Sequence, residues 1–234
     1  TYGTGCFALT NTGTDIIESE NGLLTTVAYQ IEGEEPLYAI EGSVPIAGAA
    51  VQWLRDNLNI IKSSDEIESL AMGEKDNGDV YFVPAFSGLF SPHWDETARG
   101  SLFGLTRFSN KSHIARSVLE SVAFQSYELL QSMEKDLGIE FQNLKVDGGM
   151  VSNNLLMQFQ SDILNKTIIS QEINEITALG AGVASYIFAN NLKIENVGDF
   201  ISTSESWNPN MSNESRKNLL SSWYKAIEKS KHWL

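Results

Sequence analysis

Residues 146–154 read Val146-Asp147-Gly148-Gly149-Met150-Val151-Ser152-Asn153-Asn154; here a predicted strand ends, two glycines turn the chain and a helix begins. Gly148 and Gly149 have no side chains, so a flat ring or a phosphate group can lie against the main chain, while Asn153 can reach polar edges from the first helical turn. The alternative is a tight strand-to-helix turn in which Asn153 serves only as a helix cap. From this stretch alone the two interpretations are equally favoured.

Downstream of residue 110, strands alternate with helices. We predict, in chain order, a helix over 112–137, a strand over 141–146, a helix over 152–164, a strand over 166–170, a helix over 177–189, an extended region over 195–210 and a terminal helix carrying Trp223, Tyr224, Ile227 and Trp233. Ser112 is the expected cap of the long helix, and Gly138 is its expected stop. This alternation predicts an α/β fold with a mixed sheet flanked by helices.

The first 110 residues read instead as short strands broken by turns. We predict antiparallel strands within 7–46, including the runs 23–29 and 37–40. A helix over 47–54 capped by Ser43 and a short acidic helix started by Ser63 and Glu66 follow. After them we expect a strand over 81–86 that ends near Pro84 and a loop over 87–99. The chain therefore begins with antiparallel β structure and continues as α/β within one domain.

A second glycine turn stands at residues 1–7, Thr1-Tyr2-Gly3-Thr4-Gly5-Cys6-Phe7. Gly3 and Gly5 let the main chain approach an anion and present N–H groups to it, and Thr4 adds a hydroxyl donor. A plain β-turn is the more frequent origin of such a run. Because the sequence opens inside what reads as a hairpin, we expect it to be part of a longer polypeptide.

Small residues make up most of two predicted helical segments, 47–50 and 177–184. Helix-on-sheet packing is the favoured explanation, since a glycine in a helix costs roughly 1 kcal/mol and close packing compensates for it. The coincidence of two such segments with two glycine turns also favours a ligand site.

Composition limits the partners. The 234 residues carry a formal net charge of -14, which argues against nucleic acid or an anionic membrane surface as the main partner. An acidic protein that handles phosphate needs local main-chain donors, helix N-termini or a bound cation. Cys6 is the only cysteine, which excludes an intrachain disulfide and a multi-cysteine metal site and favours the cytosol. No apolar run approaches the roughly 18 residues of a membrane span.

Other catalytic arrangements receive no support. His93, His113 and His232 have no second histidine or cysteine at ligand spacing, so we expect no histidine-based metal site. No nucleophile elbow, Walker loop or protein-kinase glycine loop occurs. In the loop 94–100, a structural salt bridge from Asp95 or Glu96 to Arg99 is favoured over catalysis.

Together these segments resemble the C-terminal domain of the FGGY carbohydrate kinases, in the actin, Hsp70 and hexokinase superfamily, over essentially the whole chain. The resemblance rests on residues 1–7, 20–26, 52–56, 84–89 and 147–149. Its most specific part is the second family signature, Gly100-x-Leu102-x-Gly104-Leu105 followed by His113-Ile114 and Ser117-Val118-Leu119-Glu120. Residues 1–7 are more similar to the glycerol kinases than to the xylulose and gluconate kinases.

The resemblance implies a ribonuclease H-like (actin-like ATPase) domain that binds ATP beside a second domain. It implies that Thr4, with Gly3 and Gly5, contacts the β- and γ-phosphates, and that Gly48 and Gln52 line the nucleotide site. It implies that Gly149 and Asn153, which follow Gly148, hold the adenosine. It also implies that Phe7 packs on the carbon face of glycerol. Phosphoryl transfer needs positioning and charge neutralisation, so the acidic composition makes Mg²⁺ the expected companion of ATP.

The resemblance also implies what residues 1–234 do not contain. The family's catalytic Asp lies upstream of the turn at 1–7, and the residues that bind glycerol hydroxyls belong to an N-terminal domain. We therefore expect no catalytic base and no metal ligand here, a missing first strand, and a chain that is inactive alone. The whole protein is expected to be a cytoplasmic homo-oligomer that binds ATP, ADP and glycerol. Another FGGY sugar or polyol kinase and a non-catalytic nucleotide-binding module remain as alternatives.

Overall fold

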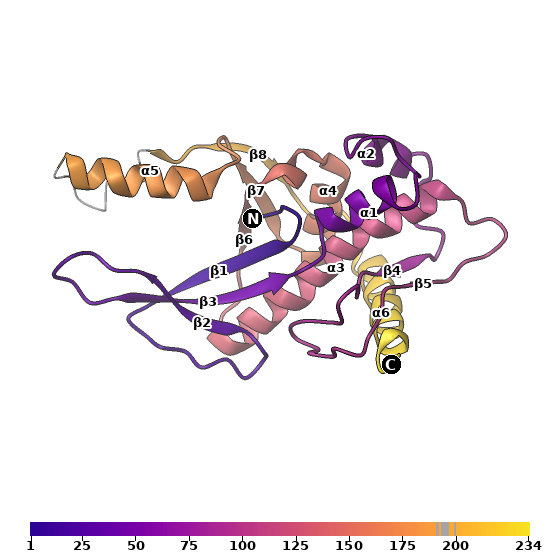
Figure 1. Ribbon diagram of the computed structural model, residues 1–234, viewed down its shortest axis with the longest axis horizontal. Helices are drawn as coiled ribbons and strands as arrows, with labels where there is room; N and C mark the ends of the chain where they lie inside the picture. Colours follow the sequence, from indigo (N-terminus) through magenta and orange to yellow (C-terminus); the bar gives the residue numbers. More distant parts are fainter. Residues whose placement is uncertain (191, 193–196, 199) are drawn as a thin grey trace.

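The computed structural model describes residues 1–190, 192, 197–198 and 200–234, and small sheets pack around a long central helix (Figure 1). The first sheet contains β1 (Cys6–Gly13), β2 (Leu24–Tyr29) and β3 (Leu37–Val44) in the order β1-β3-β2, with both pairs antiparallel. The predicted antiparallel start of the chain is confirmed.

The other strands form two further sheets. A two-stranded antiparallel sheet joins β4 (Tyr81–Val83) to β5 (Ser101–Phe103), and Pro84 follows the end of β4 as expected. In the third sheet, β6 (Asn143–Val146) is parallel to β7 (Thr167–Gln171), and β8 (Thr203–Trp207) is antiparallel to β7. The predicted mixed sheet is therefore present as β6-β7-β8, and the described strands are divided among three sheets.

The central helix is α3 (Lys111–Leu137), and it ends where the sequence predicts, at Gly138 with φ 64°. Its cap is Asn110 and not Ser112. The Asn110 side-chain oxygen accepts hydrogen bonds from the main-chain N–H groups of Ser112 and His113, at 2.9 and 3.3 Å. Asn is as good a cap as Ser, and it stands in extended backbone one residue before the helix, where a cap has to lie.

Two other predicted caps are wrong. Helix α1 (Gly48–Asp56) has no side-chain cap, because Ser43 belongs to β3 and pairs with Phe7 of β1. Helix α2 (Glu66–Ala71) follows the turn at Ser63, but the Ser63 carbonyl, not its hydroxyl, accepts from Glu66 N. The Glu66 carboxylate instead accepts from the main-chain N–H of Lys62 at 3.0 Å.

The C-terminal helices follow the predicted order. A 3-10 turn, η1 (Gly149–Ser152), precedes α4 (Asn154–Leu164), so the α-helix begins two residues later than expected. Helices α5 (Ile176–Ala189) and α6 (Asn213–Ser230) follow, and Trp233 lies beyond the end of α6. Of the expected extended region 195–210, residues 195, 196 and 199 lie outside the described residues, and β8 occupies part of the rest.

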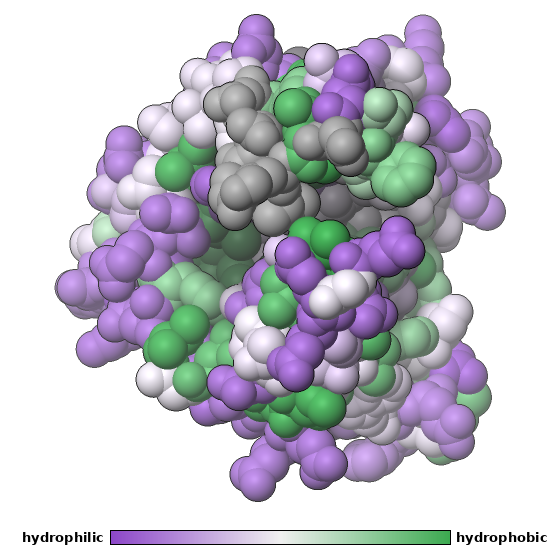
Figure 2. All heavy atoms as spheres, turned by 90° about the vertical axis from the view of Figure 1, so that its left-hand side faces the viewer, coloured by the Kyte–Doolittle hydropathy of each residue, from purple (hydrophilic) through white to green (hydrophobic). Residues whose placement is uncertain are grey.

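Helix α5 does not show the helix-on-sheet packing expected for its small residues. It extends away from β6, β7 and β8 and runs alongside the first sheet without packing closely on it (Figure 1), and Val183 is its one buried residue among those described. A side chain added at Gly180 or Gly182 would have no neighbour within 4 Å. Apolar residues instead gather in the recess between α5 and the hairpin of β2 and β3 (Figure 2), a groove of about 910 Å³. Gly180 and Gly182 therefore mediate no close helix-on-sheet contact among the described residues.

The core lies between α3, α4, α6 and the strands that cover them. Phe124 of α3 is its centre, because its ring stacks on Trp223 of α6 at 5.0 Å and meets Phe159 of α4 edge-on at 5.4 Å. Both Phe124 and Trp223 are almost completely buried. This core fixes α3 and α4, which form two sides of the cavity described next.

Candidate nucleotide-binding site

A cavity of about 490 Å³ opens between the first turn of the chain, α1, α2 and the η1–α4 turn, with Leu119 of α3 among its lining residues. Figure 1 shows α1, α2 and α4 gathered at one end of the molecule. Six residues singled out from the sequence line this cavity together, although they come from three separate segments: Gly3, Thr4, Gly48, Gln52, Gly149 and Asn153. Its volume is typical of small-molecule sites.

The turn at 3–5 is fixed by the start of α1. The Gly3 carbonyl accepts from Gly48 N at 3.0 Å, and the Thr4 carbonyl accepts from Ala47 N and Ala49 N at 2.9 and 3.0 Å. These bonds hold the carbonyl groups toward α1. The exposed Thr4 hydroxyl has no hydrogen-bond partner among the described residues, so it is available to a ligand in the cavity.

Two of the predicted glycines are required by close main-chain approach. A Cβ at Gly48 would lie 2.6 Å from the Gly3 carbonyl oxygen, and a Cβ at Gly5 would lie 2.6 Å from the Val44 carbonyl oxygen. Gly5 is buried and does not line the cavity. Gly5 therefore packs the turn against Val44, whereas Gly3 and Thr4 line the cavity where a ligand would lie.

The second glycine turn is bonded to the first. Tyr2 donates its main-chain N–H to the Asp147 carbonyl at 2.7 Å and accepts from Met150 N at 3.2 Å. Gly148 has φ 98°, and a Cβ there would lie 2.5 Å from the Tyr2 carbonyl oxygen. Gly148 thus joins the two turns and does not line the cavity. A side chain at Gly149 would meet nothing within 4 Å, and this residue does line it.

Asn153 is the cap of α4 and also lines the cavity. Its side-chain oxygen caps α4 by accepting from Leu156 N at 2.8 Å. It also lines the cavity, and its side-chain amide nitrogen has no partner among the described residues. The cap therefore fixes the orientation of a side chain that keeps one donor group for a ligand.

Phe7 lies elsewhere. It is 48% exposed and lines a separate groove of about 440 Å³ between β1 and β6. Nearby Cys6 is buried, which raises the pKa of its thiol to about 12 and makes it a poor nucleophile.

The sequence interpretation missed the α2 side of the cavity. Ser64, Asp65, Ile67 and Glu68 all line it. The acidic helix was predicted, but its position beside α4 depends on packing between segments far apart in the chain, which no local pattern reveals. Asp65 and Glu68 add two carboxylates to this side of the cavity.

The predicted salt bridge in the loop 94–100 is wrong. Arg99 donates to the main-chain carbonyls of Glu96 and Ala98, at 2.9 and 2.7 Å. Asp95 instead accepts from the hydroxyl of Thr97 at 2.6 Å and from His232 N at 3.0 Å, and these bonds lower its pKa to about 2. Asp95 orders its own loop and the end of the chain, because main-chain donors lie closer to it than the Arg99 guanidinium.

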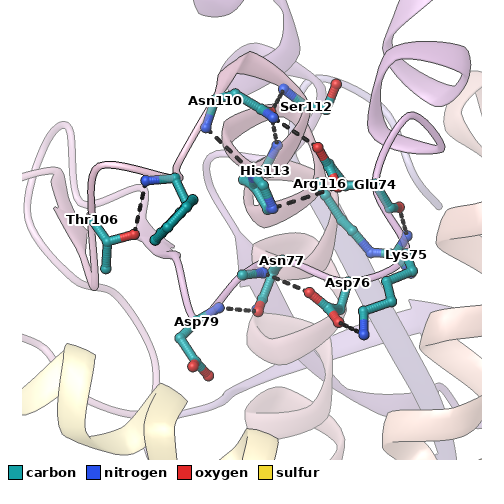
Figure 3. A network of polar contacts seen from close by, with 12 residues as sticks. Glu74, Lys75, Asp76, Asn77, Asp79, Thr106, Asn110, Ser112, His113 and Arg116 are labelled. Atoms are coloured by element: carbon teal, nitrogen blue, oxygen red, sulfur yellow. Dashed lines mark hydrogen bonds and ion pairs between the residues drawn. The ribbon is translucent and has the colours of Figure 1, made fainter.

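Residues at the start of α3 form a polar network outside the cavity, and Glu120 of the family signature belongs to it (Figure 3). Asn110 donates to Glu74 at 2.7 Å, and Arg116 donates to the Glu74 carbonyl at 3.0 Å. Asn77 and Arg116 both donate to Glu120, at 2.8 and 3.0 Å. Burial raises the pKa of Glu120 to about 7 although both partners lower it. The network attaches the segment after α2 to α3.

Comparison with known proteins decides the family. The C-terminal domain of the FGGY family of carbohydrate kinases matches residues 1–187. The chain belongs to the FGGY carbohydrate kinases. Among curated FGGY relatives, the glycerol kinases of Brucella anthropi and Methylobacterium radiotolerans are 53% and 50% identical to it, and each alignment covers 100% of the chain and 47% of the relative. The chain thus spans about half the length of the relatives it matches.

Solved structures of FGGY kinases share its fold. A glycerol kinase from Plasmodium falciparum with ADP has a TM-score of 0.89 and 37% identity, and it covers 98% of this chain and 46% of its own. A xylulose kinase from Rhodospirillum rubrum, at 20% identity, has a TM-score of 0.79 over 97% of this chain and 46% of its own. The expected actin-like ATPase fold is confirmed.

Two findings concern only the part of the chain that the structure describes. Within it, no helix is both long and apolar enough to cross a membrane. Within the same residues, no group of three or more His, Cys, Asp or Glu side chains is placed to hold a metal ion.

Proposed function

We propose that this chain is the nucleotide-binding half of a glycerol kinase, which transfers the γ-phosphoryl group of ATP to glycerol to give glycerol 3-phosphate. The observation that carries the proposal is the cavity, which Thr4 and Asn153 line together from two bonded glycine turns. Among the described residues, the Thr4 hydroxyl and the Asn153 amide nitrogen have no hydrogen-bond partner. The identity of about 50% to glycerol kinases over the whole chain supports glycerol over other sugars and polyols.

The polarity of the cavity supports one orientation of ATP. The phosphates would lie at Gly3 and Thr4, where hydroxyl and main-chain donors suit an anion. The adenosine would lie at Gly149 and Asn153, where the bare main chain admits a flat ring and the amide meets a polar edge. Mg²⁺ would bind between the phosphates and offset the repulsion from a chain of net charge -14.

The rest of the reaction requires the half that the chain does not span. We propose that the catalytic Asp and the glycerol-binding side chains lie there, that Phe7 covers the carbon face of glycerol, and that residues 1–234 alone are inactive. The whole kinase would act in the cytoplasm as a homo-oligomer.

The groove between β1 and β6 supports this division. The β6 edge and one edge of β1 flank it, and Leu129, Leu130 and Met133 of α3 contribute apolar lining. Phe7 N donates to Thr1 across this edge, so Leu9, two residues further on, also points its N–H toward the groove. Folded proteins normally pair or cover such edges. An extended segment of the other half would pair here as the missing first strand.

A coupled glycerol phosphorylation assay tests the proposal. We expect no turnover from the chain alone and ATP-dependent turnover when it is combined with the N-terminal half of the Brucella anthropi glycerol kinase. Thr4→Val, which keeps the side-chain shape and removes the hydroxyl, is the matched control and is expected to lower that turnover. Turnover by the chain alone near that of an intact kinase would contradict the division, and equal turnover with Thr4→Val would contradict the phosphate site.

A further inference from the structure

Glu68 of α2 makes a contact that joins two sides of the cavity. Its carboxylate oxygen Oε1 accepts a hydrogen bond from the main-chain N–H of Leu155, in the first turn of α4, at 2.8 Å. The two residues are 87 positions apart in the chain. Glu68 is half-buried and lines the cavity, but the bond is directed at the main chain of α4.

This bond completes the first turn of α4. Leu156 N donates to the Asn153 side chain and Met157 N donates to the Asn153 carbonyl, which leaves Leu155 N for Glu68. The first N–H groups of a helix have no partner within the helix, and a carboxylate at this end is also favoured by the helix dipole. The start of α4 therefore depends on two side chains, and one of them comes from α2.

Helix α2 is held in place by hydrogen bonds between the segment that follows it and α3. After the helix ends, Glu74 and Asn77 are bonded to the first turns of α3 through Asn110, Arg116 and Glu120, as Figure 3 shows in part. Ile67, on the buried side of α2, has only 4% of its surface exposed. Glu68 is therefore presented to α4 from a fixed helix and not from a mobile loop.

We propose that Glu68 is a positioning residue for the nucleotide. By holding Leu155, it fixes the first turn of α4 against α2 and so sets where Asn153 stands relative to Thr4 in the cavity. Glu68 acts through α4 and does not touch the reacting phosphate. This role rests on the proposed nucleotide site.

Calorimetric titration of the chain with ADP tests the role through three variants. Glu68→Ala removes the acceptor, and we expect about tenfold weaker ADP binding, because hydrogen bonds to charged groups are among the stronger ones. Glu68→Gln keeps an acceptor at the same reach, and we expect it to restore most of the affinity. Glu68→Asp keeps the charge but is one methylene shorter, and we expect it to behave like Glu68→Ala.

Glu66→Ala is the matched control. Glu66 lies on the same helix, carries the same charge and also accepts a main-chain N–H, but its partner is Lys62 and it does not line the cavity. We expect its ADP affinity to match that of the unaltered chain. Hydrogen exchange provides a second measurement without ligand, since only the Glu68 variants that lose the bond should accelerate exchange at Leu155 N.

The outcomes separate this role from the proposed function. If the unaltered chain fails to bind ADP, the proposed site and the role of Glu68 both fail. If it binds ADP and Glu68→Ala binds equally well, only the positioning role fails. If Glu68→Asp retains affinity and Glu68→Gln loses it, the charge and not the contact with α4 is what matters, which also overturns the role. A poorly folded Glu68→Ala leaves the Gln and Asp pair to decide.

Discussion

Gly48 donates its main-chain N–H to the carbonyl of Gly3 at 3.0 Å, and a Cβ at Gly48 would lie only 2.6 Å from that same oxygen. This contact joins the start of α1 to the turn that presents Thr4. Helix and turn can approach so closely only because residue 48 has no side chain. The geometry of the proposed phosphate site therefore depends on the glycine that begins α1.

Gly48→Ala is expected to separate α1 from the turn. An added methyl at this distance forces a backbone shift, and we expect a loss of roughly 1–3 kcal/mol in unfolding free energy together with weaker ADP binding. Urea unfolding and calorimetric titration measure the two effects.

Gly180→Ala is the control, since it also lies in a helix but would meet nothing within 4 Å. For Gly180→Ala we expect the unfolding free energy to rise by about 0.5–1 kcal/mol and the ADP affinity to stay the same. An equal gain in unfolding free energy from both substitutions would show that helix propensity governs both sites and that the contact with Gly3 does not constrain residue 48.

Asn153→Asp separates the two roles of Asn153. The carboxylate still caps α4, so the unfolding free energy should stay within about 0.5 kcal/mol of the unaltered chain. The amide donor is lost and a negative charge is added, so ADP binding should weaken by tenfold or more. Asn153→Ala, which loses cap and donor together, is expected to lose about 1 kcal/mol as well. Full ADP affinity in Asn153→Asp would reduce the residue to a cap.

The raised pKa of Glu120 predicts that the stability of the folded chain depends on pH. Burial raises its pKa from 4.5 to about 7, so the folded chain binds this proton more tightly than the unfolded chain does. The protonated Glu120 side chain stabilises the folded chain fully below pH 4.5, and this stabilisation is lost as the pH rises through 7. Its size is roughly 1.4 kcal/mol for each unit by which the folded and unfolded pKa values differ. Arg116 and Asn77 limit the effect, and Asp76 adds to it.

Glu120→Gln removes the titration and keeps an acceptor for Asn77. The difference in unfolding free energy between this variant and the unaltered chain should therefore shift in favour of the variant between pH 5 and pH 8, as measured by urea unfolding. Parallel curves for the two proteins across this range would contradict the raised pKa.

Local patterns predicted the parts of the site that local sequence controls. The turn at Gly148 and Gly149 and the cap at Asn153 follow from turn and capping chemistry within a few residues, so the sequence indicated them directly. Even so, only the structure shows that Gly148 serves contact with Tyr2 while Gly149 is open to the cavity. A glycine needed for packing and a glycine needed for a ligand look the same in a sequence.

The remaining elements depend on contacts between distant segments. Glu68 could not be assigned to the cavity before α2 was placed beside α4, because its partner Leu155 lies far along the chain. The cap of α3 is Asn110 where the sequence predicts Ser112, because Asn and Ser cap helices equally well and a helix start is uncertain by a residue or two from sequence. Helix α5 resembles a packed helix by composition, yet its small residues are exposed.

The most direct test of the central claim is calorimetric titration of ADP into the unaltered chain and into Thr4→Val. The Thr4 hydroxyl has no hydrogen-bond partner among the residues that the structure describes, so its removal should leave the unfolding free energy nearly unchanged and weaken ADP binding several-fold. Saturable one-to-one binding that weakens in Thr4→Val is the result that the nucleotide site predicts. Absence of saturable binding, or identical affinity in the two proteins, would contradict it.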